Sequence, residues 1–539
     1  MHTKVVGSPG TGKTTYLTGF IKNELKTAQP ESMCAVTFTR SASRELIHRI
    51  TNATNLDRNA FPYFGTLHSI CYHMLGIQRN NIVTQEHIQD FCNMHRLEYS
   101  QKQLDEDAYI MSDIVDNQSP IGNIMFNIFE WSVTNYPPSP VEHMHEAPAY
   151  MFLPLETISP EDLAYYYNEW IKYKQKNDLY DFTDLLLCTL QRNLMPDIDY
   201  LIVDEFQDFS KLQYNVYKMW RYKAKTVIIA GDDAQCIYTY AGANPVYFIK
   251  EPTDKLVILK YSYRLCKQIL DYSQYVYSMM KNQIRRKIEP TGSTGAVEYA
   301  EYPTEQYLVD ELSKINNTTS VFVLARANYM VQSIAEMLLR NGITFGIIRN
   351  PSPCTTKLKR SINALITLKR KNNMQPDECK ALFSYLPAKG LIKHGMKKRV
   401  EDLNEPLTYP EVMYMFERKL PPEELLNYMQ ISENRKLLAK KRLLDNAYCQ
   451  DTEHIHIGTI HASKGLEADV VFLCDDITRT IARNLRENME SELRVFYVGI
   501  TRAKYRLVIL HKFFGKYSFD EIKPPTTMPL TNYSAGKFV

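Results

Sequence analysis

The chain has 539 residues, which is enough for several domains of about 100–200 residues each. Its apolar content of 44% and charged content of 23% are ordinary for a globular protein, and no apolar run reaches the roughly 18 residues of a membrane span. The net charge of +3 does not by itself indicate nucleic-acid binding, and the ten cysteines lie singly, without metal-site spacing. We therefore expect reduced thiols in an intracellular, cytoplasmic protein with no signal peptide and no membrane contact.

A glycine-rich stretch near the beginning, Gly7-Ser8-Pro9-Gly10-Thr11-Gly12-Lys13-Thr14, fits the pattern G-x-x-x-x-G-K-[ST] at every fixed position. It follows the apolar pair Val5-Val6 and precedes a helical run at 15–25, which is the strand–loop–helix context of a phosphate-binding loop. Glycines let backbone N–H groups point at phosphate oxygens, and the helix adds the positive end of its dipole. We expect Lys13 to reach the outer phosphates of a nucleotide and Thr14 to hold Mg²⁺.

Strands and helices alternate after this loop. Residues 33–38 predict a buried strand, and residues 64–69 predict another short strand that ends in polar groups. Such alternation predicts a parallel sheet, whose ligands bind at the carboxyl ends of the strands. Residues 78–165 are instead helical, irregular and rich in Asn, Met and Tyr, which predicts an inserted helical subdomain.

An apolar strand at 200–203 delivers two adjacent carboxylates, Asp204 and Glu205, to its carboxyl end. We expect Asp204 to hold Mg²⁺ through water and Glu205 to orient and deprotonate an attacking water molecule. A purely structural role is the alternative for such a pair. The phosphate-binding loop earlier in the chain favours the catalytic role.

A further buried strand at 226–230 opens into Gly231-Asp232-Asp233-Ala234-Gln235, which places the amide of Gln235 at the nucleotide edge of the sheet. Tyr238 and Tyr240 are two residues apart, so on an extended segment both would face one side and could stack on bases. Packing within a sheet face is the alternative for these two rings.

A second α/β unit follows, with strands predicted at 256–259, 321–325, 455–461, 469–473 and 506–510. Residues 351–450 interrupt it with a helical, proline-punctuated segment that carries 19 lysines and arginines against 11 aspartates and glutamates. The basic excess of the chain is therefore concentrated in this segment.

Taken together, these stretches resemble the UvrD/Rep/PcrA group of superfamily 1 DNA helicases, in the family's order and over nearly the whole chain. Two of the stretches, 459–467 and 497–503, are very close to the family's motifs V and VI. The other matching stretches are 7–14 (motif I), 37–45 (Ia), 65–69 (Ib), 181–186 (the DF-D-LL signature), 204–208 (II), 231–238 (III) and 263–264 (IV).

The resemblance implies an α/β fold with two RecA-like P-loop NTPase cores, each a parallel sheet flanked by helices and each carrying an inserted, mainly helical subdomain. It divides the chain into core 1A (1–77 and 166–252), subdomain 1B (78–165), core 2A (253–350 and 451–515), a reduced basic subdomain 2B (351–450) and a flexible tail (516–539).

The resemblance also assigns roles to single residues. Arg264 and Arg502 would lie in the two halves of the motor and meet the γ-phosphate of ATP, as an arginine finger does. Gln235 would sense that phosphate, and Glu467 would contact the ribose. The implied ATP-binding residues are Gly7, Ser8, Pro9, Gly10, Thr11, Gly12, Lys13, Thr14, Thr15, Asp204 and Glu467, with Mg²⁺ held by Thr14 and Asp204. The implied single-strand track consists of Thr37, Thr66, His68, Tyr238, Tyr240, Thr459 and His461; a buried structural imidazole is the alternative for both histidines.

The chain departs from the family's pattern in several places. Only residues 1–6 precede the loop, too few for the family's adenine-reading glutamine motif, so we expect looser base selectivity. Thr15 stands where the family often has arginine, and Tyr240-Ala241 replaces a Trp-Arg pair, so we expect a weaker grip on the strand. Residues 387–391 resemble a helix–hairpin–helix that contacts duplex DNA.

We therefore expect an ATP-dependent motor that moves 3′→5′ on single-stranded DNA and opens duplex, with single strands and single/double-strand junctions as its DNA partners. A free monomer and a protein partner, such as a nuclease or a replication or repair factor, are also expected. The alternative is a nucleotide-controlled single-strand-binding module that recruits a partner such as a nuclease and does little unwinding.

Overall fold

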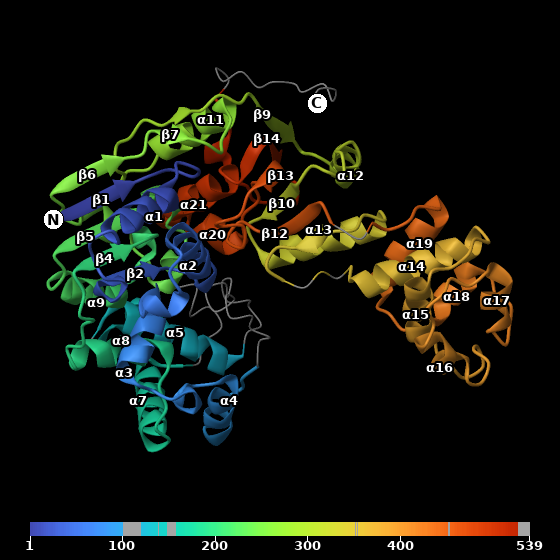
Figure 1. The fold of residues 1–539 in the computed structure, drawn as a ribbon, viewed down its shortest axis with the longest axis horizontal. Helices are drawn as coiled ribbons and strands as arrows, with labels where there is room; N and C mark the ends of the chain where they lie inside the picture. Colours follow the sequence, from blue (N-terminus) through green and yellow to red (C-terminus); the bar gives the residue numbers. More distant parts are fainter. Residues whose placement is uncertain are drawn as a thin grey trace. The chain divides into compact units, whose positions relative to one another are not determined.

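The computed structural model describes residues 1–100, 120–137, 139–147, 158–350, 352, 354–450 and 453–525. The chain divides into two compact units. Figure 1 labels their helices and strands. Unit 1 contains Met1–Gly295 and Arg483–Thr501, and unit 2 contains Ala296–Ala482 and the chain from Arg502 onward.

Unit 1 is built on a six-stranded, all-parallel sheet with the order β3-β2-β4-β5-β1-β6. Strands such as Tyr-Leu-Ile-Val in β4 are near-continuous apolar runs, as expected for a parallel sheet covered on both faces. The sheet places the ends of β1, β2, β4 and β5 at one edge. The strands are β1 (His2–Val6), β2 (Met33–Thr37), β3 (Tyr63–Thr66), β4 (Tyr200–Val203), β5 (Thr226–Gly231) and β6 (Lys255–Ile258).

The helices of unit 1 begin at clear sequence signals. Thr39 and Thr66 cap two of them by accepting backbone N–H groups, and Ser159 with Asp162 and Asp181 with Asp184 form reciprocal capping boxes. The helices are α1 (Lys13–Glu24), α2 (Arg40–Thr54), α3 (Leu67–Leu75), α4 (Gln85–Met94), α5 (Ile121–Asn135), α7 (Pro160–Lys176), α8 (Phe182–Gln191), α9 (Lys211–Arg221), α10 (Pro245–Lys250), α11 (Lys267–Ser278) and α21 (Leu485–Ile500). A short parallel pair, β7 (Tyr261–Ser262) and β8 (Glu289–Pro290), completes the unit.

Unit 2 has its own six-stranded parallel sheet with the order β11-β12-β10-β13-β14-β9. Its strands are β9 (Ala296–Glu301), β10 (Val321–Ala325), β11 (Gly346–Ile347), β12 (Ile455–Thr459), β13 (Ala468–Cys474) and β14 (Ala503–His511). Its helices are α12 (Glu305–Ser313), α13 (Asn328–Arg340), α14 (Thr356–Lys369), α15 (Pro376–Tyr385), α16 (Met396–Glu401), α17 (Tyr409–Tyr414), α18 (Pro422–Tyr428), α19 (Glu433–Asp445) and α20 (Arg479–Arg483), the last of which ends at the boundary.

The predicted fold class is confirmed: two parallel sheets flanked by helices, with helical insertions. The predicted basic segment at 351–450 is helical in its described part, as is the described part of 78–165, of which 101–119, 138 and 148–157 lie outside the described residues. The predicted strand at 64–69 ends earlier, at Thr66, because that residue caps α3.

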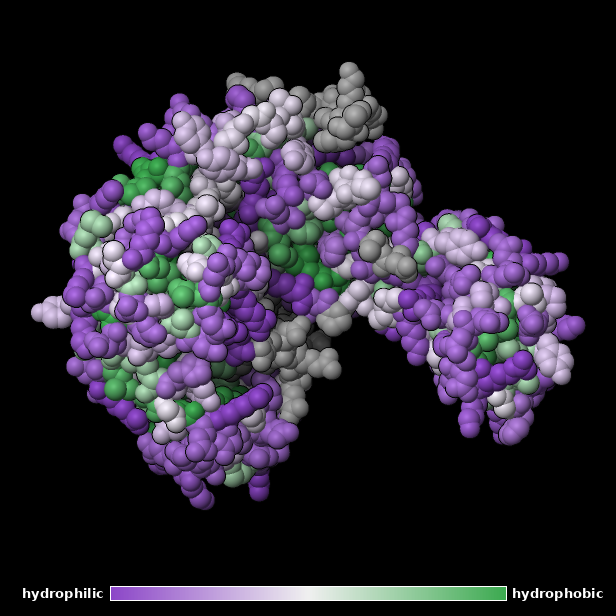
Figure 2. All heavy atoms as spheres, viewed as in Figure 1, coloured by the Kyte–Doolittle hydropathy of each residue, from purple (hydrophilic) through white to green (hydrophobic). Residues whose placement is uncertain are grey.

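The boundaries of the two units differ from the five-part division predicted from sequence. Residues 253–295, expected in the second core, belong to unit 1. Residues 516–525, expected to begin a flexible tail, carry the fully buried Phe519 and Ile522, and the rest of that tail, 526–539, lies outside the described residues. The face in Figure 2 is mostly hydrophilic, and within the described ranges no helix combines the length and apolarity that crossing a membrane requires.

Candidate nucleotide site and nucleic-acid track

The loop between β1 and α1 is a backbone cradle that only glycines allow. Gly10 and Gly12 have φ angles of +73° and +84°, which residues with a side chain rarely adopt. A Cβ added to Gly7 would stand 2.3 Å from the Thr11 Oγ1 atom. The Gly7 amide donates to the Gly231 carbonyl at 3.1 Å, which fixes the loop to the end of β5. This shape suits the phosphates of a nucleotide.

Lys13 and Thr14 begin helix α1 and face the same edge. The Lys13 ammonium donates to the Gly7 carbonyl at 3.0 Å, and the Thr14 hydroxyl lies 3.4 Å from Asp204 Oδ2. Burial and the neighbouring Glu205 charge raise the pKa of Asp204 to about 7, while Lys13 opposes the shift. A hydroxyl and a carboxylate side by side are oxygen ligands of the kind that Mg²⁺ takes, so these residues fit the ion.

Glu205 directly follows β4 in a left-handed backbone conformation with φ 54°. Such a conformation is costly for a residue with a side chain and persists only where its surroundings hold it. The Gln207 amide donates to Glu205 Oε2 at 2.5 Å, and the Glu205 amide donates to Asp204 Oδ1 at 2.9 Å. The predicted base is thus fixed beside the predicted metal ligand.

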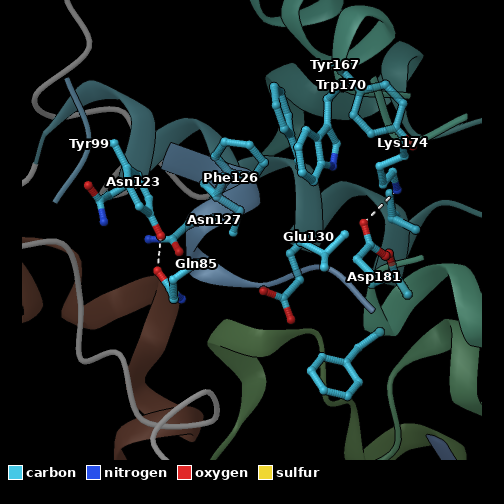
Figure 3. Close-up of a pocket in the computed structure, with 16 residues that line it drawn as sticks. Gln85, Tyr99, Asn123, Phe126, Asn127, Glu130, Tyr167, Trp170, Lys174 and Asp181 are labelled. Atoms are coloured by element: carbon cyan, nitrogen blue, oxygen red, sulfur yellow. Dashed lines mark hydrogen bonds and ion pairs between the residues drawn. The ribbon is translucent and has the colours of Figure 1, made fainter. Parts of the chain in front are cut away.

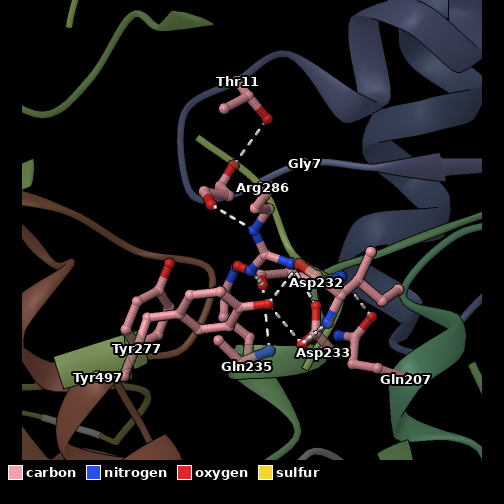
Figure 4. Close-up of polar contacts among 12 residues, drawn as sticks. Gly7, Thr11, Gln207, Asp232, Asp233, Gln235, Tyr277, Arg286 and Tyr497 are labelled. Atoms are coloured by element: carbon pink, nitrogen blue, oxygen red, sulfur yellow. Dashed lines mark hydrogen bonds and ion pairs between the residues drawn. The ribbon is translucent and has the colours of Figure 1, made fainter. Parts of the chain in front are cut away.

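Gln235 and a buried ion-pair cluster lie next to the loop (Figure 4). The Gln235 amide donates to Asp232 Oδ2 at 2.8 Å. Asp232 and Asp233 both pair with Arg286, which sequence reasoning did not identify as a site residue. Arg286 lies in the basic run 285–287, which reads as an ordinary surface stretch, so no local pattern marked it.

Arg264 lies against the loop within unit 1. A Cβ added to Gly10 would stand 2.3 Å from the Arg264 Cβ, and the Tyr263 amide donates to the Gly10 carbonyl at 2.9 Å. The Ser262 hydroxyl donates to the Pro9 carbonyl at 3.1 Å. Tyr263, which the resemblance places in motif IV together with Arg264, is 72% exposed.

Four of the predicted residues belong to unit 2. Thr459 ends β12, and His461 follows it and is buried. Arg502 is 1% exposed and donates to the Leu466 carbonyl at 2.9 Å. Glu467 lies 3.3 Å from the Lys504 ammonium. Their proposed roles toward ATP and DNA stay predictions.

The predicted track residues of unit 1 fall into two groups. Thr37 and Thr66 end strands β2 and β3, and the His68 ring meets Phe182 edge-on at 6.0 Å. Burial lowers the pKa of His68 to about 4, so this imidazole is neutral. Thr15 stands in the first turn of α1 and is exposed.

The segment that carries Tyr238 and Tyr240 is not the extended strand that their predicted alternation requires. The segment forms short 3₁₀ turns at Asp233–Gln235 and Thr239–Ala241 instead of an extended strand. Tyr238 is 2% exposed and stacks on Phe38 with ring centroids 5.2 Å apart, so the structure favours packing for it. Tyr240 is half-buried and meets Tyr238 edge-on.

A cavity of about 110 Å³ lies beside Phe182 (Figure 3). Apolar rings line part of it, and polar groups face it from both sides: amides such as Asn127 on one side, Lys174 and Asp181 on the other. Burial and the nearby Asp181 charge raise the pKa of Glu130, another lining residue, to about 7. The cavity therefore offers both stacking surfaces and hydrogen-bonding groups.

Two family models match the chain: the UvrD/REP helicase N-terminal domain over residues 1–255 and the UvrD-like helicase C-terminal domain over residues 355–512. Among similar proteins is a probable DNA helicase II homolog of Mycoplasma capricolum, 24% identical over 97% of this chain and 84% of its own. The ATP-dependent DNA helicase PcrA of Bacillus subtilis is 23% identical over 96% and 82% of the two chains. The ATP-dependent DNA helicase Rep of Buchnera aphidicola (from Schizaphis graminum) is 21% identical over 93% and 90%.

Proposed function

Because this chain belongs to the UvrD/Rep helicase family and is an ATP-dependent DNA helicase, we propose that it moves 3′→5′ along single-stranded DNA and opens the duplex ahead of it. The observation that supports an ATP-driven motor is the convergence at one sheet edge of the glycine cradle, the Asp204-Glu205 pair and Arg264. The 3′→5′ direction is proposed from the family resemblance. Such a set suits phosphoryl transfer to water, in which positioning and charge stabilisation do most of the work.

Glu205 is the group that takes the proton from the attacking water in this proposal. Its carboxylate is held by the Gln207 amide at 2.5 Å, so it is aimed before the substrate arrives. Mg²⁺, when bound by Thr14 and Asp204, would neutralise the charge of the β- and γ-phosphates. Lys13 and Arg264 supply fixed positive charge on the loop side of the same phosphates.

Single-stranded DNA is proposed to cross unit 1 past Tyr240 and the His68–Phe182 pair. Base stacking on an aromatic ring contributes roughly 1–3 kcal/mol per base and tolerates every sequence, which suits a motor that steps along any strand. The cavity beside Phe182 has rings and amides suited to hold one base during a step. Hydrolysis would then let the strand be released and recaptured in turn.

A strand-displacement assay with matched DNA substrates tests this function. Partial duplexes carrying either a 3′ or a 5′ single-stranded tail of equal length and sequence are mixed with the protein and ATP. We expect opening of the 3′-tailed substrate and little opening of the 5′-tailed one. The reverse preference would overturn the direction. Movement on single strands without opening of either substrate would favour the recruiting module over the helicase.

A further inference from the structure

Arg286 is a buried arginine at the nucleotide edge of unit 1 with partners on three sides. Its guanidinium pairs with Asp232 and Asp233, and its Nε donates to the Ser8 hydroxyl at 3.1 Å. It also lies over the Tyr277 ring, 4.3 Å from the centroid. Burial opposes its charge, but the two carboxylates outweigh burial and raise the pKa of Arg286 well above its usual range. Figure 4 shows it between the loop and the aspartates.

One set of hydrogen bonds connects Arg286, through Asp232, to Gln235 and Glu205, the two side chains proposed to act in hydrolysis. Asp232 accepts a hydrogen bond from the Gln235 amide at 2.8 Å, and its backbone N–H donates to Gln207 Oε1 at 3.0 Å. Gln207 in turn donates to Glu205 Oε2 at 2.5 Å. Arg286 therefore pairs with an aspartate to which Gln235 is bonded directly and Glu205 through Gln207.

A second set of contacts connects Arg286, through Asp233, to helix α21. The Asp233 carbonyl accepts from Arg494 Nε at 3.0 Å. The Tyr497 ring lies 6.1 Å from the Tyr277 ring, whose hydroxyl donates to Asp233 Oδ2 at 2.8 Å. Arg494 and Tyr497 lie on α21. Ser8 is therefore connected to this helix through Arg286 and Asp233.

We propose that Arg286 is a positioning residue for ATP hydrolysis, which joins Asp232 to Ser8 and so holds Gln235 and Glu205 in register with the phosphate-binding loop. The inference rests on the proposed function only in taking ATP as the substrate. Arginine is required because its rigid fork reaches three partners in fixed directions, whereas the lysine ammonium is a single point charge. Small misplacements of catalytic groups are enough to cost about a hundredfold in rate.

Arg286→Lys is the first test, because it keeps the positive charge among the aspartates but loses the fork. In steady-state ATP hydrolysis without DNA, we expect kcat to fall about ten- to a hundredfold while KM stays within about threefold. Ser8→Ala removes only the hydroxyl and is expected to lower kcat by about three- to tenfold. The double variant is expected to be no slower than Arg286→Lys, because both changes break the same link.

Arg506→Lys is the matched control. Arg506 is a partly buried arginine that also has two carboxylate partners, Glu298 and Glu311 at 2.8 and 2.6 Å, but it lies in unit 2. It is expected to lose stability and keep kcat. Unchanged kcat in Arg286→Lys, or losses that simply multiply in the double variant, would overturn the proposal.

Should Arg286→Lys fail to fold, Ser8→Ala decides alone, since it leaves every ion pair intact; an unchanged kcat would then overturn the proposal. Folding is followed by tryptophan fluorescence, because Trp131, Trp170 and Trp220 are the chain's three tryptophans and all lie in unit 1. If the wild-type protein hydrolysed ATP but did not move on DNA, the proposed helicase mechanism would be wrong. The test of Arg286 would still be valid, because it measures hydrolysis without DNA.

Discussion

Gly10 and Arg264 lie so close that a Cβ on the glycine would stand 2.3 Å from the Cβ of Arg264. The approach brings an arginine encoded 254 residues later against the phosphate-binding loop. Because only hydrogen fits between them, the loop and the arginine depend on each other.

Gly10→Ala should therefore lower kcat/KM for ATP at least about tenfold, because Arg264 must move away to make room. Gly76→Ala is the matched control: Gly76 has a φ of +65° in unit 1, but nothing lies within 4 Å of an added Cβ. We expect it to cost about 1–2 kcal/mol of stability and leave the kinetics unchanged. Equal kinetic losses in both variants would mean that backbone strain, not Arg264, is the cause.

Glu205→Gln and Lys13→Ala should each abolish DNA-stimulated ATP hydrolysis, with a loss of about a hundredfold or more, while single-strand binding survives. The first removes the base but keeps its hydrogen-bonding shape, and the second removes the cation next to the Gly7 carbonyl. The measurements are steady-state phosphate release and fluorescence anisotropy of a labelled oligonucleotide. Normal turnover in either variant would refute the assigned roles.

Tyr240→Ala should slow movement along DNA more than it slows basal hydrolysis, because a half-buried ring can still meet a base. Tyr238→Ala should instead lower the free energy of unfolding by about 3 kcal/mol, since it removes a ring buried against Phe38. Tyr222→Ala, which changes a 95% exposed ring, is the control. Equal losses of movement and hydrolysis in Tyr240→Ala would show that Tyr240 is structural.

The Asp181–Lys174–Asp184 cluster predicts a pH dependence of stability. Lys174 lies 2.6 Å and 2.5 Å from the two carboxylates. Burial, together with the Asp181 charge, raises the pKa of Asp184 to about 6 against an ordinary 3.8. The folded state thus binds a proton that the unfolded state releases between about pH 4 and 6, so this group's contribution to stability falls as pH rises through that window.

Asp184→Asn mimics the protonated acid. As pH rises from 5 to 7.5, its free energy of unfolding should increase by about 1 kcal/mol relative to that of the wild type. Urea unfolding followed by tryptophan fluorescence measures this, since the three tryptophans report on unit 1. Asp162→Asn is the control for loss of a capping-box carboxylate, here in α7. Its difference in free energy of unfolding from the wild type should not change over the same pH range. A constant difference for Asp184→Asn at all pH values would contradict the prediction.

The phosphate-binding loop could be predicted because its chemistry is local: consecutive residues supply the turn, the cation and the helix start. Tyr238 and Tyr240 could not be placed from spacing, because 3₁₀ turns replace the extended segment that the alternation assumes. Arg286 could not be identified from its neighbours in the sequence, because its proposed role depends on two aspartates more than 50 residues earlier in the chain. Tertiary packing, rather than pattern, decided these positions.

The central claim is that hydrolysis at this loop drives movement along a single strand, and stopped-flow translocation on end-labelled oligonucleotides of increasing length tests it most directly. The account predicts that, with ATP, the delay before the signal grows in proportion to oligonucleotide length when the label is at the 5′ end. Glu205→Gln still binds the strand but should not move along it, so the length-dependent arrival signal should be absent in this variant. A delay that does not depend on length, or one that persists in Glu205→Gln, would contradict the account.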